Sequence, residues 1–116
     1  MSYTTSCHCG TISATVDGDL PASGMTCNCS MCRRKGTILH FVPTAEATVD
    51  APADKLGDYT FNRQMIHHHF CTECGCTPFA LGTGPDGREM VAVNLRCVPE
   101  CDIDALEINR VDGASF

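Results

Sequence analysis

The order of apolar and polar positions along the chain predicts short β-strands. Residues 11–16 alternate, so that Ile12, Ala14 and Val16 share one face, which is typical of a strand with one side on a core. The apolar run 90–95 (MVAVNL) predicts a fully buried strand. Three further β-prone runs are 37–42, 58–61 and 65–70, with a turn predicted at 62–63 between the last two.

The segments between these runs carry turn-forming residues and almost no helical periodicity. Two glycines, a proline and the pair Asp86-Gly87 predict a hairpin loop at 81–88. Residues 45–55, which include Pro52, predict a loop without pattern. Residues 105–108 fit either a strand or a short helical turn, because so short a run shows no period. Many short strands with almost no helix predict an all-β domain.

Length and charge narrow the class of protein further. The 116 residues predict a single domain over 1–116. A net charge of −6 argues against a nucleic-acid groove, and the basic run Arg33-Arg34-Lys35, taken alone, predicts a solvated turn. The chain has no apolar run long enough to span a membrane, and its first residues lack a secretory signal, so we expect a cytoplasmic protein. An edge strand in so small a β domain could pair two copies into a homodimer.

Ten cysteines are the most unusual feature of the composition. Five disulfides would be the simplest interpretation of an even number. The cysteines are clustered, however, as CHC, CNCSMC and CTECGC. Two cysteines one residue apart rarely bridge each other, whereas tight clusters bring thiolates together around one cation. We therefore predict zinc sites rather than disulfides, in keeping with a cytoplasmic protein.

Four of these cysteines predict a closed metal site. Cys7 and Cys9 stand at the start of a predicted hairpin, and Cys71 and Cys74 stand in CTECG, where Gly75 can adopt a positive φ. Four thiolates complete a tetrahedral zinc site, so we expect a structural role. Such a site would tie the N-terminal strand to a turn more than 60 residues later.

A second cluster predicts an open metal site. Cys27, Cys29 and Cys32 offer three thiolates, and three protein ligands with one free position are typical of catalytic zinc. Arg33 follows directly and could contact an anionic substrate. Alternatively, the cluster is a second structural site, completed by a fourth ligand from Cys76, Cys97, Cys101 or a histidine.

The remaining cysteines and three consecutive histidines have simpler interpretations. Strand alternation places His67 and His69 on one face and His68 on the other. We interpret them as half-exposed strand residues, with the alternative that one is a general base for a thiol. Cys76 is expected to be a small buried residue, and Cys97 and Cys101 reduced core cysteines.

The order of the cysteine motifs resembles a known family. CHCG, then CNCSMCRRKG, then HHFCTECG resemble the glutathione-dependent formaldehyde-activating family, also called the centromere protein V domain family. The likeness runs from Cys7 through MVAVNLRC to the closing VDG. It implies the all-β architecture of the Mss4-like group, a folded tent of short antiparallel sheets stapled by zinc, and two zinc ions per chain. The ligands implied are Cys7, Cys9, Cys71 and Cys74 for structural zinc, and Cys27, Cys29 and Cys32 for active-site zinc.

The same resemblance implies an activity, namely the joining of glutathione and formaldehyde through a carbon–sulfur bond. Chemistry agrees, because zinc deprotonates a bound thiol and polarises a carbonyl. We therefore expect a zinc-dependent carbon–sulfur lyase that acts on a glutathione-like thiol and a small aldehyde. The alternative is a zinc-stabilised binding module without turnover. An open position in a pocket would favour the enzyme, and a second site closed by four protein ligands would favour the module.

Overall fold

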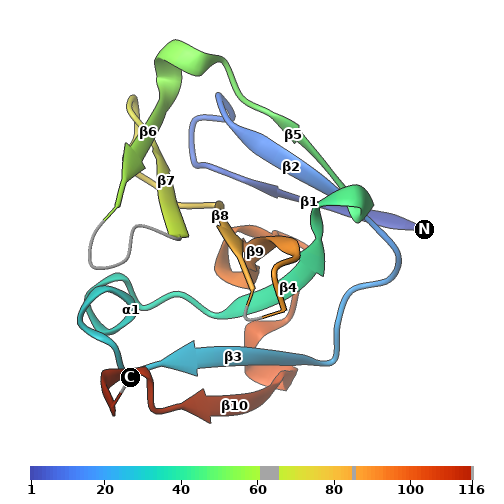
Figure 1. Ribbon diagram of the computed structural model, residues 1–116. Helices are drawn as coiled ribbons and strands as arrows, with labels where there is room; N and C mark the ends of the chain where they lie inside the picture. Colours follow the sequence, from blue (N-terminus) through green and yellow to red (C-terminus); the bar gives the residue numbers. More distant parts are fainter. Residues whose placement is uncertain (61–65, 85, 116) are drawn as a thin grey trace.

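A computed structural model describes residues 1–60, 66–84 and 86–115, and these residues form two β-sheets and one α-helix (Figure 1). The smaller sheet is antiparallel, in the order β1-β2-β5, and consists of β1 (Ser2–Ser6), β2 (Ser13–Asp17) and β5 (Ala47–Asp50). The larger sheet has the order β10-β3-β4-β9-β8-β7-β6. Its strands are β3 (Ser23–Cys27), β4 (Leu39–Pro43), β6 (Leu56–Tyr59), β7 (Ile66–Cys71), β8 (Phe79–Thr83), β9 (Glu89–Asn94) and β10 (Glu107–Val111).

The other described elements are short. Helix α1 (Ser30–Lys35) follows β3 directly. The 3-10 turns are η1 (Thr44–Glu46), η2 (Ala53–Lys55), η3 (Leu95–Cys97), η4 (Ile103–Ala105) and η5 (Gly113–Ser115). Within the described ranges, no helix is long and apolar enough to cross a membrane.

The hydrophobic core lies between the two sheets. Ile12, Ala14 and Val16 are buried on the side of the smaller sheet, and Val91 and Val93 are buried on the side of the larger one. Because side chains alternate along a strand, the intervening residues of β9 point to the opposite face of the larger sheet. That second face carries the site described below.

Most of the strand predictions are confirmed. The predicted strands at 11–16, 37–42, 65–70 and 90–95 correspond to β2, β4, β7 and β9, although the bounds shift by up to two residues. The predicted hairpin loop at 81–88 does join β8 to β9, with the Gly84 N–H donating to the carbonyl of Arg88 over 2.7 Å, but residues 81–83 belong to β8 and not to the loop. The predicted 58–61 strand is found in part as β6, whereas the turn at 62–63 lies outside the described residues.

Other expectations were wrong or incomplete. Residues 45–55 were expected to be a loop, but they contain two 3-10 turns and β5, whose backbone pairs with β2. Residues 105–108 are neither strand nor turn alone, because η4 ends at Ala105 and β10 begins at Glu107. No strand was predicted for β1, β3 or β8, and α1 replaces the turn expected around Arg33. The sheets are also not wholly antiparallel, since β10 pairs with β3 in parallel.

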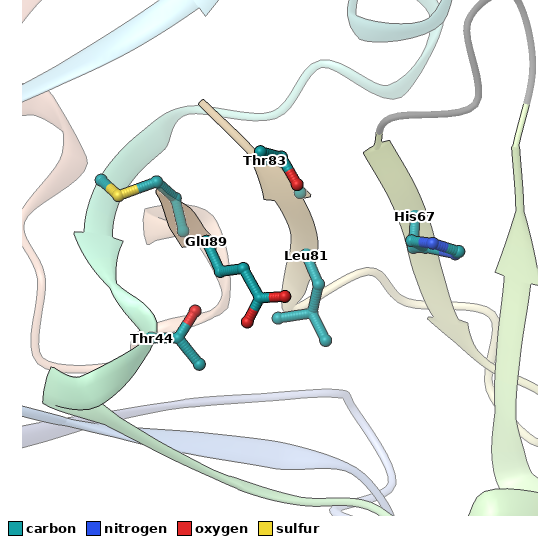
Figure 2. A pocket seen from close by; sticks show the side chains of 7 residues that line it. Thr44, His67, Leu81, Thr83 and Glu89 are labelled. Carbon is teal, nitrogen blue, oxygen red and sulfur yellow. The ribbon is translucent and has the colours of Figure 1, made fainter. Parts of the chain in front are cut away.

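A hollow of about 330 Å³ opens on the core side of the larger sheet (Figure 2). His67 lines it from β7, Leu81 and Thr83 from β8, and Glu89 from β9, with Thr44 at the side of η1. His67 forms an ion pair with Asp58, with 2.9 Å between Nδ1 and Oδ2. None of the described residues lining this hollow is a cysteine, so it lies apart from both metal-binding groups.

Candidate metal centres and the neighbouring pockets

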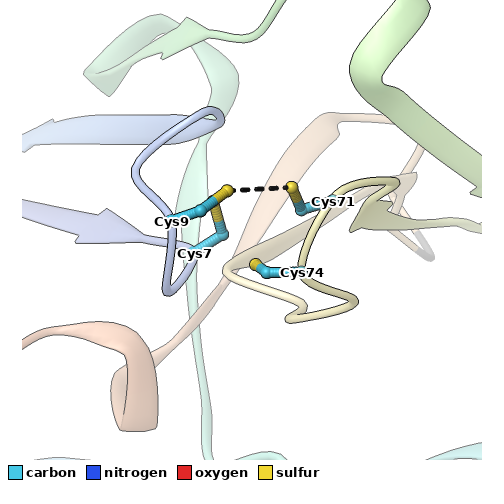
Figure 3. A group of neighbouring side chains, drawn as sticks. All are labelled: Cys7, Cys9, Cys71 and Cys74. Atoms are coloured by element: carbon cyan, nitrogen blue, oxygen red, sulfur yellow. Dashed lines mark hydrogen bonds between the residues drawn. The ribbon is translucent and has the colours of Figure 1, made fainter.

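The first cysteine group joins the two sheets (Figure 3). Cys7 and Cys9 lie in the turn between β1 and β2, Cys71 ends β7, and Cys74 lies in the following turn. The four sulfur atoms all lie within 4.8 Å of one another. The distance between the Sγ atoms is 3.7 Å for Cys7 and Cys9 and 3.6 Å for Cys9 and Cys71. The predicted Cys₄ set is therefore assembled by the fold.

Backbone N–H groups surround these sulfurs. Ile12 N–H donates to Cys7 Sγ and Glu73 N–H donates to Cys71 Sγ, each over 3.4 Å. Backbone hydrogen bonds from Cys76 and Cys9 lower the pKa of the Cys74 thiol to about 6. Metal ions bind the thiolate form of cysteine and not the thiol. A lowered pKa favours the thiolate, so the group suits a cation such as zinc, which binds sulfur readily.

The turn that presents Cys74 has the geometry expected from CTECG. Gly75 has a φ of 82°, which a residue with a Cβ adopts only with strain. This conformation lets the Gly75 N–H donate to the carbonyl of Cys71 over 2.8 Å, while the Cys71 N–H donates to that of Cys76 over 2.9 Å. The glycine is thus part of what turns both sulfurs toward the N-terminal hairpin.

The second cysteine group lies where β3 passes into α1. Cys27 is the last residue of β3, Cys29 is the N-cap of α1, and Cys32 lies within the helix. Their three sulfur atoms lie within 4.8 Å of one another. Cys29 Sγ accepts a hydrogen bond from the Cys32 N–H over 3.3 Å, and Cys27 Sγ accepts one from the Cys29 N–H over 3.4 Å. The helix start therefore aims two sulfurs at the third.

The three thiols of this group have different acidities. Burial raises the pKa of Cys32 to about 12. Burial acts in the same direction on Cys29, but hydrogen bonds from Cys32 outweigh it and lower the pKa of Cys29. The group can hold a metal ion through three sulfurs. Among the described residues, no fourth cysteine, histidine or carboxylate joins it, so the fourth ligands considered from the sequence, Cys76, Cys97 and Cys101, lie outside the group.

The segment after β10 packs directly against this group. Asn28 Nδ2 donates to Asp112 Oδ1 over 2.9 Å, and the Ala114 N–H donates to Asn28 Oδ1 over 2.9 Å. A Cβ placed on Gly113 would overlap Cys27 Sγ and also lie 3.3 Å from the Cβ of Cys29. Sequence reasoning noted the closing VDG but not this role, because nothing local to Gly113 indicates what it faces.

Two hollows of different chemical character meet at the second group. An apolar pocket of about 180 Å³ is bounded by its three cysteines, Lys35 and the outer face of the larger sheet. A more open groove of about 430 Å³ is lined by Cys27, Asn28, Arg33, Arg110 and Asp112. Cys27 lines both. Arg110 was missed by sequence reasoning, because a lone arginine in a strand carries no signal of its partners.

Comparison with known proteins identifies the family. A family model described as glutathione-dependent formaldehyde-activating enzyme matches residues 2–107. The chain belongs to this family. A structural-genomics crystal structure of a Rhodobacter sphaeroides protein is also similar, with a TM-score of 0.78 and 26% sequence identity over 93% of this chain and 99% of that one. The resemblance drawn from the three cysteine motifs and the all-β fold expectation are both confirmed.

In this member of the glutathione-dependent formaldehyde-activating family, the three histidines divide between two faces as alternation predicts. The rings of His67 and His69 stack with 6.0 Å between their centroids, and His69 Nδ1–H donates to the carbonyl of Gly57 over 3.0 Å. His68 points to the other face and lines the apolar pocket. The expectation of half-exposed histidines was wrong for two of them, because His68 and His69 are buried within the larger sheet.

The three remaining cysteines are free and half-buried, as are most members of the two groups. No disulfide links any of the ten cysteines. Cys97 Sγ lies 3.6 Å from the carbonyl of Thr77, and burial raises the pKa of its thiol to about 11. Cys97 and Cys101, expected as reduced core cysteines, are only half-buried, and Cys76 is also less buried than expected.

Proposed function

We propose that this family member catalyses the reversible joining of a glutathione-like thiol to a small aldehyde, as a zinc-dependent carbon–sulfur lyase. Its family membership supports a glutathione-dependent, formaldehyde-activating type of function. In the joining direction the thiol adds across the carbonyl. A sulfur–carbon bond forms, the carbonyl oxygen becomes a hydroxyl, and the proton lost by the thiol is the one gained by that oxygen. No oxidant or reductant takes part.

The proposal includes two zinc ions with different roles. Cys7, Cys9, Cys71 and Cys74 would hold a structural ion, since four sulfurs complete its coordination. The ion of the active site would be held by Cys27, Cys29 and Cys32, which leave one position for substrate. When bound there, zinc supplies Lewis acidity and lowers the pKa of a thiol.

The observation that carries the proposal is that Cys27 lines both the groove, which also holds Arg33 and Arg110, and the apolar pocket. A thiol that bears carboxylates can lie in the groove with its sulfur at the cysteine group. Arg33 and Arg110 line the groove, and their guanidinium groups suit carboxylates. The aldehyde then approaches the sulfur from the apolar pocket, which Cys27 also lines.

His68 is our candidate for handling the proton in this reaction. It lines the pocket together with the three cysteines. Burial, and then the charge of Lys35, lowers the pKa of His68, so its ring is neutral at neutral pH and able to accept a proton. In this role His68 takes the thiol proton and returns it to the carbonyl oxygen.

A zinc-stabilised binding module without turnover is less well supported. Such a module needs no open coordination position, and closing the second group with a fourth protein ligand would stabilise it further. Among the described residues, the apolar pocket instead lies against the three cysteines of the second group.

The proposal is tested with zinc-loaded protein, glutathione and formaldehyde. NMR exchange spectroscopy at equilibrium measures how fast S-hydroxymethylglutathione forms and breaks down, relative to buffer alone. We expect wild type to accelerate exchange, Cys29→Ser to fall to the buffer rate, and Cys101→Ser, which changes a cysteine outside both groups, to behave as wild type. Wild type with two bound zinc ions and the buffer rate would instead favour the binding module.

A further inference from the structure

We propose that the apolar pocket beside the second cysteine group binds the substituent of the aldehyde, and that the preferred substrates are aldehydes with an apolar group of about four to six carbon atoms. This inference rests on the proposed function and deepens it by naming the class of aldehyde.

The pocket exists because two small residues occupy the middle of a row of side chains. Phe41, Ala92, Ala80 and His68 are successive neighbours across β4, β9, β8 and β7. Side chains directly opposite one another on adjacent strands share a face and lie close together. Two methyl groups between two rings leave the surface of the sheet low at its centre, and this hollow accounts for the pocket of about 180 Å³.

The inner surface of the pocket is almost entirely apolar. The amide of Asn94 also lines it, but its polar atoms are already engaged. Asn94 Oδ1 accepts from the N–H groups of Ile38 and Arg96 over 3.3 and 3.2 Å, and its Nδ2 donates to the carbonyl of Thr77 over 2.9 Å. Burying a polar group without partners is unfavourable, so the inner end of this pocket suits hydrocarbon.

The second cysteine group forms part of the lining of the pocket. Cys27, Cys29 and Cys32 line it together with Lys35, which is half-buried and ends the same helix. Phe41 and Ile66, which are 43% and 46% exposed, also line the pocket and give it an apolar border. An aldehyde fits this arrangement with its carbonyl toward the cysteines and His68 and its substituent over Ala80 and Ala92, next to Phe41.

The volume of the pocket distinguishes this proposal from a pocket that binds formaldehyde alone. An apolar cavity of about 150 Å³ accommodates benzene. A pocket of about 180 Å³ therefore accommodates a phenyl or branched alkyl group. Formaldehyde has no substituent and would leave this space empty. Each CH₂ group that is buried should strengthen transition-state binding by about fourfold.

The thiol is excluded from this pocket by its charge. A glutathione-like thiol bears carboxylates, which suit the groove that Arg33 and Arg110 line next to Cys27. The bond changes are those already described: sulfur bonds to the aldehyde carbon, and the thiol proton passes to the carbonyl oxygen. The two substrates thus meet at Cys27, which lines both hollows.

The test compares aldehydes on zinc-loaded wild-type protein with glutathione as the thiol. Formaldehyde, 3-methylbutanal and benzaldehyde are compared by kcat/KM above the buffer rate, after correction for hydration of each aldehyde. We expect both larger aldehydes to exceed formaldehyde by at least tenfold. A parallel measurement uses the unreactive alcohol 3-methylbutan-1-ol and follows its binding through the methyl NMR signals of Ala80 and Ala92.

Variants then test whether the pocket determines the preference for larger aldehydes. Ala92→Leu fills it, and the ratio of kcat/KM for 3-methylbutanal to that for formaldehyde should fall at least tenfold. Phe41→Ala, at an exposed position, should shift the preference toward longer aldehydes, and it serves if Ala92→Leu does not fold. Val49→Ala, a similarly exposed apolar residue on the smaller sheet, should leave the ratio unchanged.

Two results would overturn the inference. One is a wild-type preference for formaldehyde over both larger aldehydes, and the other is an unchanged ratio in both Ala92→Leu and Phe41→Ala. Failure of the proposed function looks different, because then no aldehyde, formaldehyde included, reacts faster than in buffer. In that case, binding of 3-methylbutan-1-ol would still support an apolar binding site, although one without catalysis.

Discussion

Arg33 and Arg34 are adjacent in α1 and both exposed, yet they face different surroundings. Arg33 lines the groove beside Cys27, whereas Arg34 donates from Nη1 to the carbonyl of Ser30 over 2.8 Å. Neighbouring residues on a helix point about 100° apart, so the pair offers a matched test of the groove.

Arg33→Ala should raise the KM for glutathione about three- to tenfold and leave kcat nearly unchanged. The reason is that a contact with a remote carboxylate acts equally on the bound substrate and on the transition state. Arg34→Ala removes the same charge from the same helix and should leave KM within experimental error. Equal effects of the two variants would indicate a general effect of charge and not a contact in the groove.

Gly113→Ala should weaken zinc binding at the second group about tenfold or more, because the added Cβ must displace Cys27 Sγ. Competition with a chelator, followed by elemental analysis, measures this affinity. The zinc of the first group provides an internal control, since its ligands do not touch this segment, and one tightly held ion per chain should remain. Two equally tight ions in the variant would contradict the packing described here.

His40 gives a prediction about pH. It is half-buried in β4, and burial lowers its pKa below the ordinary value of 6.5. Between the folded pKa and 6.5, the unfolded chain binds a proton more readily than the folded one. His40 therefore favours unfolding progressively as the pH falls through this window and has no such effect above it. His40→Gln should unfold with a smaller loss of stability between pH 7 and pH 5 than wild type, as measured by urea titration at each pH.

At the scale of an element, α1 shows how the second cysteine group is built. Its N-cap is Cys29, whose sulfur accepts the hydrogen bond that a serine or aspartate oxygen usually accepts. The helix has only six residues, and none of them is buried. Sequence reasoning could not find it, because both its capping residue and its short length lack the usual signals.

Cys29→Ser should remove one zinc ion and the activity while leaving the fold intact. Serine is a good N-cap, so α1 should persist with an oxygen in place of the sulfur. The three ligands come from six consecutive residues, so the loss of this ion opens no long loop. Elemental analysis and thermal unfolding measure the two effects, and a shift in Tm as large as that of Cys7→Ser would assign a structural role to the second group.

The strands around this group show the same limit of local reasoning. β10 pairs with β3 in parallel, with Arg110 opposite Thr26 and Val111 opposite Cys27. This pairing brings residues more than 80 positions apart to the same site. The cysteine ligands were predictable because their spacing carries the chemistry. Arg110, Gly113 and the pocket were not, because they depend on which strands become neighbours.

At the scale of the whole molecule, the first cysteine group links the two sheets. Cys7→Ser should unfold the protein, because structural zinc contributes about 10 kcal/mol or more, comparable to the whole stability of a small domain. Circular dichroism with and without a chelator measures this loss. The control is Cys101→Ser, which should retain the native spectrum. A folded Cys7→Ser with full zinc content would contradict the structural role.

The strands buried on one face were the most predictable part of the whole. Val91 and Val93 lie in an apolar run, and Ile12, Ala14 and Val16 alternate, because burial against a core imposes that pattern. β5 was missed because its residues are mostly exposed and it is defined mainly by backbone pairing with β2. Strand propensity and hydrophobic pattern reflect the burial of side chains. They therefore do not predict a strand that is defined mainly by backbone hydrogen bonds.

Strand β9 has a consequence for how this protein could change over evolutionary time. Its odd-numbered valines, Val91 and Val93, face the core, whereas Ala92 faces the pocket and pairs with Ala80. Substitutions on the two faces are therefore largely independent in their effects. A lineage could alter residues 80 and 92, and so acquire new substrates, while the core that keeps the chain folded stays untouched. A library randomised at these two positions should contain mostly folded members with diverging substrate ranges, whereas one randomised at 91 and 93 should contain few folded members at all.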